Sequence, residues 1–223
     1  MKTVKAQRGQ LSPSLKVSEW VQGQPITLED LKGKVVVIEV FQVNCPGCFI
    51  YGLPEAIGLA KTYSNKDVAV LGLATAFEDF DKNTLENLKI LLTKREPIGE
   101  TLRTLKYQGQ LDAEMKIPYK IPFPVAMDLL LKEEHPISDD KAMDYIRSNV
   151  EDFDLYHPKD KAELLRRVRE YLDSRAYTPA TFEEFGLKGT PSTIYLDKKG
   201  NLHDTKFGSQ GTMKYTVDKL LSE

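Results

Sequence analysis

Two stretches of the chain are almost continuously apolar and rich in β-branched residues. They are Val35–Phe41 and residues 67–77, which read DVAVLGLATAF. Such runs are typical of strands that are buried on both faces of a parallel sheet. A shorter apolar segment at residues 123–127 predicts a third strand, and the mixed segment 15–31, which contains turn residues, can hold a short strand pair. The apolar pattern therefore predicts a sheet with a buried centre.

Helical periodicity appears between these strands. Residues 48–63 predict a helix that Pro54 is expected to kink, because proline removes a helical hydrogen bond. Residues 81–94 predict an amphipathic helix with its leucines along one side. Strands and helices thus alternate through the first half of the chain, as in a βαβ unit.

The C-terminal end of the chain returns to the strand pattern. Residues 192–197 and Leu202–Phe207 predict two strands joined by a short turn, which makes them antiparallel, and residues 212–221 predict a closing helix. A βαβ core with a terminal hairpin and helix is a small α/β sandwich.

Residues 130–181 differ in character from the segments around them. They carry two charged, amphipathic helical patterns, at 139–150 and 159–174, and Pro158 suits the first turn of the second helix. We therefore predict a single domain, 1–223, with 130–181 as a helical insertion within it. The inserted helices either cap a neighbouring site and select a partner, or form a satellite hairpin or a dimer contact.

Composition narrows the class of protein. The 223 residues are 41% apolar and 29% charged, which is normal for a globular protein. The formal net charge of −2 argues against general binding of nucleic acid or of a membrane surface, and the apolar stretches are too short to span a bilayer. The N-terminus has lysines but no apolar core of a signal peptide. We expect a cytoplasmic location, with periplasmic or other export as the alternative if a leader has been removed.

The chain has only two cysteines, Cys45 and Cys48, in the sequence FQVNCPGCF. They directly follow the first apolar strand and directly precede a predicted helix. The positive end of the helix dipole favours thiolate over thiol there, and a second thiol one turn further on can close a disulfide with the first. A strand, a C-x-x-C motif and a helix in this order indicate a thioredoxin-like redox site.

Longer motifs extend this indication. The stretches LEDLKGKVVVIEVFQVNCPGC, FPVAMD and FGLKGTPSTIYLDKKGNL, and the helix after FGSQGT, resemble the thioredoxin superfamily and within it the TlpA/ResA-like thiol-disulfide oxidoreductases, relatives of the AhpC/TSA redoxins. They follow the family's order over about two-thirds of the chain. The resemblance implies a three-layer α/β/α sandwich with a mixed central sheet. It also implies that Thr190 and Pro191 form a cis-proline loop facing the disulfide.

The sequence departs from this family in four places. Asn44 replaces the tryptophan that usually precedes the first cysteine, and Pro46 and Gly47 stand between the cysteines in the reverse of thioredoxin's order. Pro54, the helix proline, comes one position later than usual. The fourth departure is the insertion 130–181. The residues Asn44, Pro46 and Gly47 affect the expected redox potential, and the insertion affects the expected substrate.

The motif suggests a role for each cysteine. Cys45, exposed by the helix geometry, is the candidate nucleophile, and Cys48 is the candidate resolving thiol that releases the substrate from a mixed disulfide. The flanking residues Asn44 and Phe49 either contact substrate or belong to the ordinary surface.

Glu39 is a carboxylate in the middle of the otherwise apolar strand, six residues before Cys45. A buried carboxyl has a raised pKa and can exchange a proton near neutrality, which would help Cys48 to attack. The alternative is that Glu39 reaches solvent at the sheet edge or pairs with a lysine.

The sequence suggests no metal and no organic cofactor. Zinc prefers four ligands, and the three histidines show no paired ligand spacing beside the two cysteines. There is no glycine-rich nucleotide fingerprint, so electrons are expected from a thiol donor, with a protein disulfide as substrate. A half zinc site or an inert buried pair is the structural alternative.

The sequence predicts a protein-disulfide reductase and leaves three other functions open. A dithiol oxidase shares the fold and can also carry a helical insertion. A thiol peroxidase shares it too, but its P-x-x-x-T-x-x-C motif is absent before either cysteine. A redox-inactive binding scaffold would not need two correctly spaced thiols. Fold alone does not choose among these functions.

Overall fold

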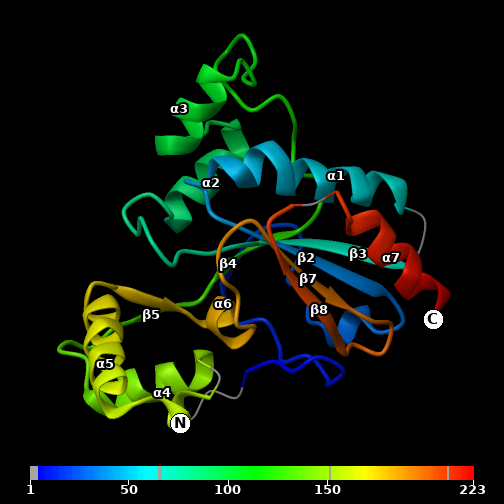
Figure 1. Ribbon diagram of the computed structural model, residues 1–223. Helices are drawn as coiled ribbons and strands as arrows, with labels where there is room; N and C mark the ends of the chain where they lie inside the picture. The colour runs from blue at the N-terminus through cyan, green and yellow to red at the C-terminus, as the bar shows by residue number, and fades with distance from the viewer. Residues whose placement is uncertain (1–4, 65–66, 151, 210) are drawn as a thin grey trace.

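A mixed sheet forms the centre of the molecule (Figure 1). The computed structural model describes residues 5–64, 67–150, 152–209 and 211–223, and within them a six-stranded sheet has the order β1-β4-β3-β2-β7-β8. Its strands are β1 (Val17–Gln22), β2 (Val35–Phe41), β3 (Val68–Ala74), β4 (Val125–Asp128), β7 (Ser192–Leu196) and β8 (Leu202–Phe207). The strands predicted from the two long apolar runs are confirmed as β2 and β3.

Strand β2 lies inside the sheet and sets the position of the residues that follow it. It pairs in parallel with β3 and antiparallel with β7, and all seven of its residues are buried. Side chains alternate across a strand, so Glu39 shares a face with Val37 and Phe41. The predicted C-terminal hairpin is also confirmed, because β7 and β8 pair antiparallel.

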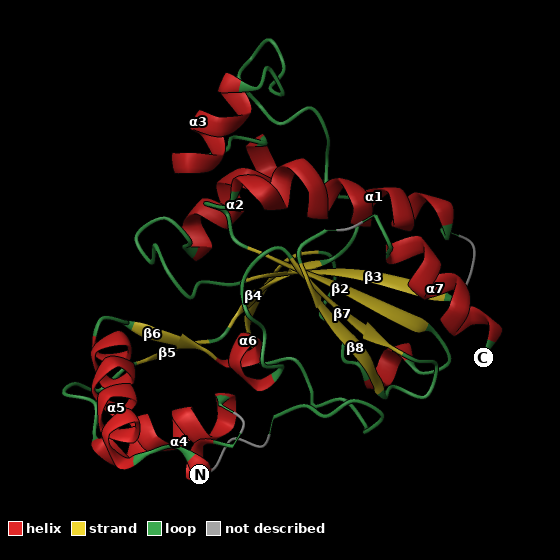
Figure 2. Ribbon diagram, in the orientation of Figure 1, coloured by secondary structure: helices red, strands yellow, loops and turns green. Residues whose placement is uncertain are grey.

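Helices cover both faces of the sheet (Figures 1 and 2). Helices α1 (Leu53–Thr62) and α7 (Met213–Ser222) lie on one face, and α6 (Ala180–Glu184) lies on the other. Helices α2 (Leu85–Lys94) and α3 (Gly99–Tyr107) extend the first layer. Each face has its own cluster of buried apolar side chains. The predicted three-layer α/β/α arrangement is confirmed.

Three local features differ from the sequence prediction. Helix α2 begins at Leu85 rather than at residue 81, because the Thr84 hydroxyl accepts a hydrogen bond from the Asn87 N–H (3.1 Å) and caps the helix there. Helix α3 was not predicted; it is short, and only two of its residues, Thr101 and Leu105, are buried. Segment 15–31 contains one strand, β1, and a short 3-10 turn, and β1 pairs with β4.

The segment 130–181 contains the two predicted helices and one unpredicted feature. Its elements are β5 (Leu130–Lys132), α4 (Asp139–Asn149), the 3-10 turn η3 (Phe153–Leu155), α5 (Pro158–Asp173) and β6 (Tyr177–Pro179). Strands β5 and β6 pair antiparallel and form a small second sheet. The helices enclose an apolar cluster of their own, and Figure 1 shows them on the side of the sheet opposite α1. These observations favour a satellite unit over a cap.

Aromatic contacts and one buried carboxylate attach this segment to the sheet. The rings of Phe80, after β3, and Tyr177, in β6, lie with centroids 5.5 Å apart, and Phe182, just after the segment, stacks on Phe77 with centroids 4.8 Å apart. Asp128, fully buried at the end of β4, accepts hydrogen bonds from the N–H groups of Thr181 (2.9 Å) and Phe182 (3.1 Å) at the start of α6. None of the helices in the described residues is both long and apolar enough to cross a membrane.

Candidate active site

The two cysteines form a disulfide at the point where β2 gives way to a helix. Cys45 and Cys48 are bonded, with their Cα atoms 5.4 Å apart. Cys45 is partly exposed, whereas Cys48 is completely buried. The N–H of Cys48 lies 3.2 Å from Cys45 Sγ, so a backbone donor at the helix start faces the accessible sulfur. Such a donor stabilises negative charge on Cys45 when the bond is open.

The loop before β7 faces the disulfide. The peptide bond between Thr190 and Pro191 is cis, and the Thr190 carbonyl oxygen lies 3.6 Å from Cys45 Sγ. The Thr190 hydroxyl donates to Gln42 Oε1 (3.3 Å), just beyond the end of β2. A Cβ added to Gly47 would lie 3.7 Å from Pro191 Cδ, so the C-P-G-C turn and the loop are in contact.

Glu39 lies beneath this contact. Its side chain is fully buried on an interior strand, and its Oε2 accepts a hydrogen bond from the Thr193 hydroxyl (3.0 Å). Its Oε1 accepts none from the described residues. Burial raises the pKa of Glu39 well above its ordinary value, the Thr193 hydrogen bond opposes that rise, and the charge of Glu55 adds to it. The carboxyl therefore holds its proton at a pH where an exposed glutamate has lost it.

Gly52 is part of the site and was not predicted from the sequence. A Cβ at this position would lie 2.1 Å from Glu39 Oε1 and 2.7 Å from Pro191 Cβ. The helix, the central strand and the cis-proline loop therefore meet at a point with no room for a side chain. In the sequence, the only indication of this close approach was a glycine one turn after the second cysteine.

The start of the helix differs from the predicted kink at Pro54. The residues directly after the C-P-G turn form a π-helical turn, Cys48–Gly52, and the regular helix α1 begins after it. Pro54 lies in the first turn of α1, where proline is tolerated. The irregularity therefore precedes the proline and occupies the turn that carries Cys48.

Asn44 is buried and does not belong to the surface. It is 8% exposed, and its N–H donates to Asn83 Oδ1 (2.8 Å). Its side chain donates to Asp79 Oδ2 (2.7 Å) and accepts from the Glu100 N–H (2.7 Å) at the start of α3. The residue that replaces the usual tryptophan thus attaches an unpredicted helix to the loop before Cys45. Phe49, the other flanking residue, is also buried, at 2% exposure.

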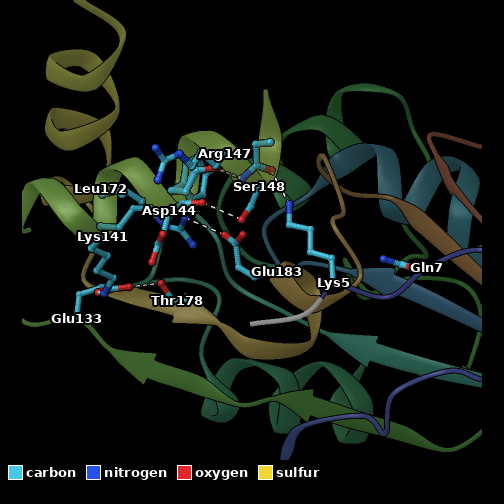
Figure 3. Close-up of a pocket in the computed structure, with 13 residues that line it drawn as sticks. Lys5, Gln7, Glu133, Lys141, Asp144, Arg147, Ser148, Leu172, Thr178 and Glu183 are labelled. Atoms are coloured by element: carbon cyan, nitrogen blue, oxygen red, sulfur yellow. Dashed lines mark hydrogen bonds and ion pairs between the residues drawn. The ribbon is translucent and has the colours of Figure 1, made fainter. Parts of the chain in front are cut away.

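A large cavity lies away from these residues, against the inserted helices (Figure 3). Its volume is about 790 Å³, and it is lined by residues of the insertion, the N-terminal segment and Glu183, with none of the predicted site residues among them. Several of its charged groups bind one another: Arg175 pairs with Glu183 (2.9 Å), and Lys141 pairs with Glu133. The disulfide therefore lies outside this cavity.

Comparison with known proteins agrees with this geometry. No family model and no curated protein matches the chain. Among solved structures, a thioredoxin-like superfamily protein is 28% identical, with a TM-score of 0.59 over 96% of this chain and 98% of that one. A thiol-disulfide isomerase from Corynebacterium glutamicum is 29% identical, with a TM-score of 0.59 over 96% of each chain. A thioredoxin-like protein in its oxidised form, 15% identical with a TM-score of 0.50, shows the shared fold alone.

The fold and the site define a thioredoxin-like protein with a C-x-x-C disulfide. Its structural neighbours are thioredoxin-like thiol-disulfide oxidoreductases that match nearly the full chain, which confirms the resemblance drawn from the sequence motifs. The chain thus has the fold of thiol-disulfide oxidoreductases, and Cys45 and Cys48 form its disulfide.

The close approach at Gly52 predicts a large effect of one added methyl group. Gly52→Ala should lower the free energy of unfolding by about 2–3 kcal/mol, because Glu39 and Pro191 must both move. Gly58→Ala is the matched control: its added Cβ meets nothing within 4 Å, and alanine in a helix should gain up to about 1 kcal/mol. Urea unfolding of the oxidised proteins measures both. Equal stability of the two variants would contradict the proposed contact.

The burial of Glu39 predicts a pH-dependent stability difference between the wild type and Glu39→Gln. Above the ordinary value of 4.5 the unfolded chain loses the proton while the folded chain keeps it. The folded state then binds more protons, so the unfolding free energy falls as pH rises. Glutamine does not titrate. The unfolding free energy of Glu39→Gln relative to the wild type should therefore rise with pH, by about 1.4 kcal/mol for each unit by which the Glu39 pKa is raised, and then level off. Urea unfolding across this pH range gives the difference, and a constant value would contradict the burial.

Proposed function

We propose that the protein is a protein-disulfide reductase that works through the Cys45–Cys48 pair. The observation that supports this most directly is the pairing of a partly exposed Cys45 with a buried Cys48 at a helix start, beside the Thr190 carbonyl. An exposed sulfur can meet a protein substrate, and a buried one can only complete the exchange inside the molecule.

In the first step, the Cys45 thiolate attacks one sulfur of the substrate disulfide. A bond forms between Cys45 and that sulfur, and the other substrate sulfur leaves as a thiolate. The N–H of Cys48, 3.2 Å from Cys45 Sγ, stabilises the attacking thiolate. The backbone of the cis-proline loop lies beside the mixed disulfide and is available to an extended substrate.

In the second step, the Cys48 thiolate attacks Cys45 Sγ, and the substrate sulfur leaves as a thiolate that takes its proton from solvent. The protein gives up two electrons and is left with the disulfide seen in the structure. We assign Glu39 to proton exchange with Cys48: its ionised form takes the thiol proton before attack, and its neutral form returns a proton when the disulfide is reduced again. A thiol donor then restores the dithiol.

The reductive direction is the finer part of the proposal. It is supported by the resemblance to TlpA/ResA-like proteins and by the small number of cysteines, which suits a reducing compartment such as the cytoplasm. The opposite direction would make the protein a dithiol oxidase of an oxidising compartment. The two differ in the reduction potential of one pair of sulfurs.

Replacing each cysteine should separate the two steps. Cys45→Ser should abolish reduction of a protein disulfide, because no thiolate can attack. Cys48→Ser should form the mixed disulfide and fail to release it, so that one substrate molecule stays bound per protein. Non-reducing electrophoresis and intact mass measure the trapped species. Trapping by Cys45→Ser but not by Cys48→Ser would reverse the roles, and trapping by neither would contradict disulfide exchange.

A further inference from the structure

The turn that carries Cys48 contains one more residue than an α-helical turn. The N–H of Leu53 donates to the carbonyl of Cys48, five residues earlier, and the turn Cys48–Gly52 is π-helical. An α-helix would place this donor four residues away. The extra residue accounts for the position of Pro54, which is one later in this sequence than in the family it resembles.

Pro54 creates an unsatisfied acceptor in this turn. If the π-helical hydrogen bonding continued, the N–H of residue 54 would donate to the carbonyl of Phe49, but proline has no N–H. The neighbouring donor, the Leu53 N–H, already donates to the Cys48 carbonyl oxygen. The Phe49 carbonyl therefore needs a partner from outside the helix, because a buried carbonyl left unpaired costs free energy.

Tyr119 supplies that partner. Its hydroxyl donates to the Phe49 carbonyl oxygen at 2.7 Å, and its ring packs against the apolar cluster beneath α1. The loop that carries Tyr119 is fixed in turn: the Ile117 N–H donates to the Arg95 carbonyl (2.9 Å), and the Arg95 guanidinium donates to the Ile117 carbonyl (2.8 Å). The donor is therefore held in place from outside the redox helix.

We propose that Tyr119 is a positioning residue for thiol-disulfide exchange: its hydroxyl replaces the amide that Pro54 lacks and holds the π turn that carries Cys48. This inference rests on the proposed function. The same turn presents Gly52 to Glu39 and Pro191, so the hydroxyl acts on the site through the backbone without touching the sulfurs.

The hydrogen bond should matter more to the disulfide than to the dithiol. The disulfide requires Cys48 at bonding distance from Cys45, whereas two free thiols tolerate a relaxed turn. Removing the hydroxyl should therefore weaken the disulfide relative to the dithiol. The equilibrium that reports this is dithiol protein plus oxidised glutathione giving disulfide protein plus two reduced glutathione molecules.

The test is a double-mutant cycle on the full chain. Tyr119→Phe should lower this equilibrium constant about fivefold, the effect of one net hydrogen bond. Pro54→Ala restores an amide at residue 54, so in that background Tyr119→Phe should change the constant less than twofold. Tyr107→Phe, which removes the hydroxyl of a side chain 92% exposed, is the control and should leave the constant unchanged.

Each outcome decides for or against Tyr119. No effect of Tyr119→Phe, or an equal effect with and without Pro54→Ala, would overturn the proposal. If Tyr119→Phe alone fails to fold, folding of the double variant supports the proposal and failure of both contradicts it. If the wild type forms no disulfide at any glutathione ratio, the proposed function fails and the role of Tyr119 in thiol-disulfide exchange fails with it. Urea unfolding of the same four proteins then still shows whether the Pro54 amide and the Tyr119 hydroxyl substitute for each other.

Discussion

The close approach of the redox helix to the central strand is the constraint on which the site depends. At Gly52 the helix backbone leaves no space for a Cβ between Glu39 and Pro191. Three segments distant in sequence, the interior strand, the helix after the C-x-x-C motif and the cis-proline loop, therefore meet beside Cys48. The buried Glu39 carboxyl and the buried Cys48 sulfur lie on the same side of the sheet, because Glu39 shares a strand face with Val37 and Phe41, which pack in one cluster with Cys48.

Other parts of the molecule support the contact from outside. Tyr119 donates to the carbonyl of Phe49 within the π turn. Asn44 joins the loop before Cys45 to the start of α3 through its side-chain oxygen. The inserted segment has its own apolar cluster, and its attachment through Asp128 lies at the end of β4. Hydrogen bonds of Tyr119 and Asn44 thus hold the segments on either side of the disulfide, whereas the inserted segment packs as a separate unit.

Most of the fold could be predicted because burial leaves a strong pattern. Val35–Phe41 is apolar along its whole length, and it is the buried interior strand. Helix α3 leaves a weaker pattern, since only two of its residues are buried and Asn44, from a remote segment, accepts the hydrogen bond of the Glu100 N–H in its first turn. The π turn could not be predicted either, because its hydrogen bonds depend on Pro54 and on a tyrosine more than sixty residues away. The spacing of apolar residues predicts which strands and helices are buried. It does not predict a single hydrogen bond between residues that are far apart in the sequence.

The reduction potential of the Cys45–Cys48 pair decides whether this protein reduces protein disulfides or forms them. The full-length protein would be equilibrated with glutathione at a series of ratios, and the fraction of disulfide would be measured by thiol alkylation and mass. We predict a single two-electron transition at a reducing potential, near thioredoxin's value of about −270 mV. A value near about −120 mV would contradict the reductive direction and indicate an oxidant. Absence of any transition would contradict a redox function altogether.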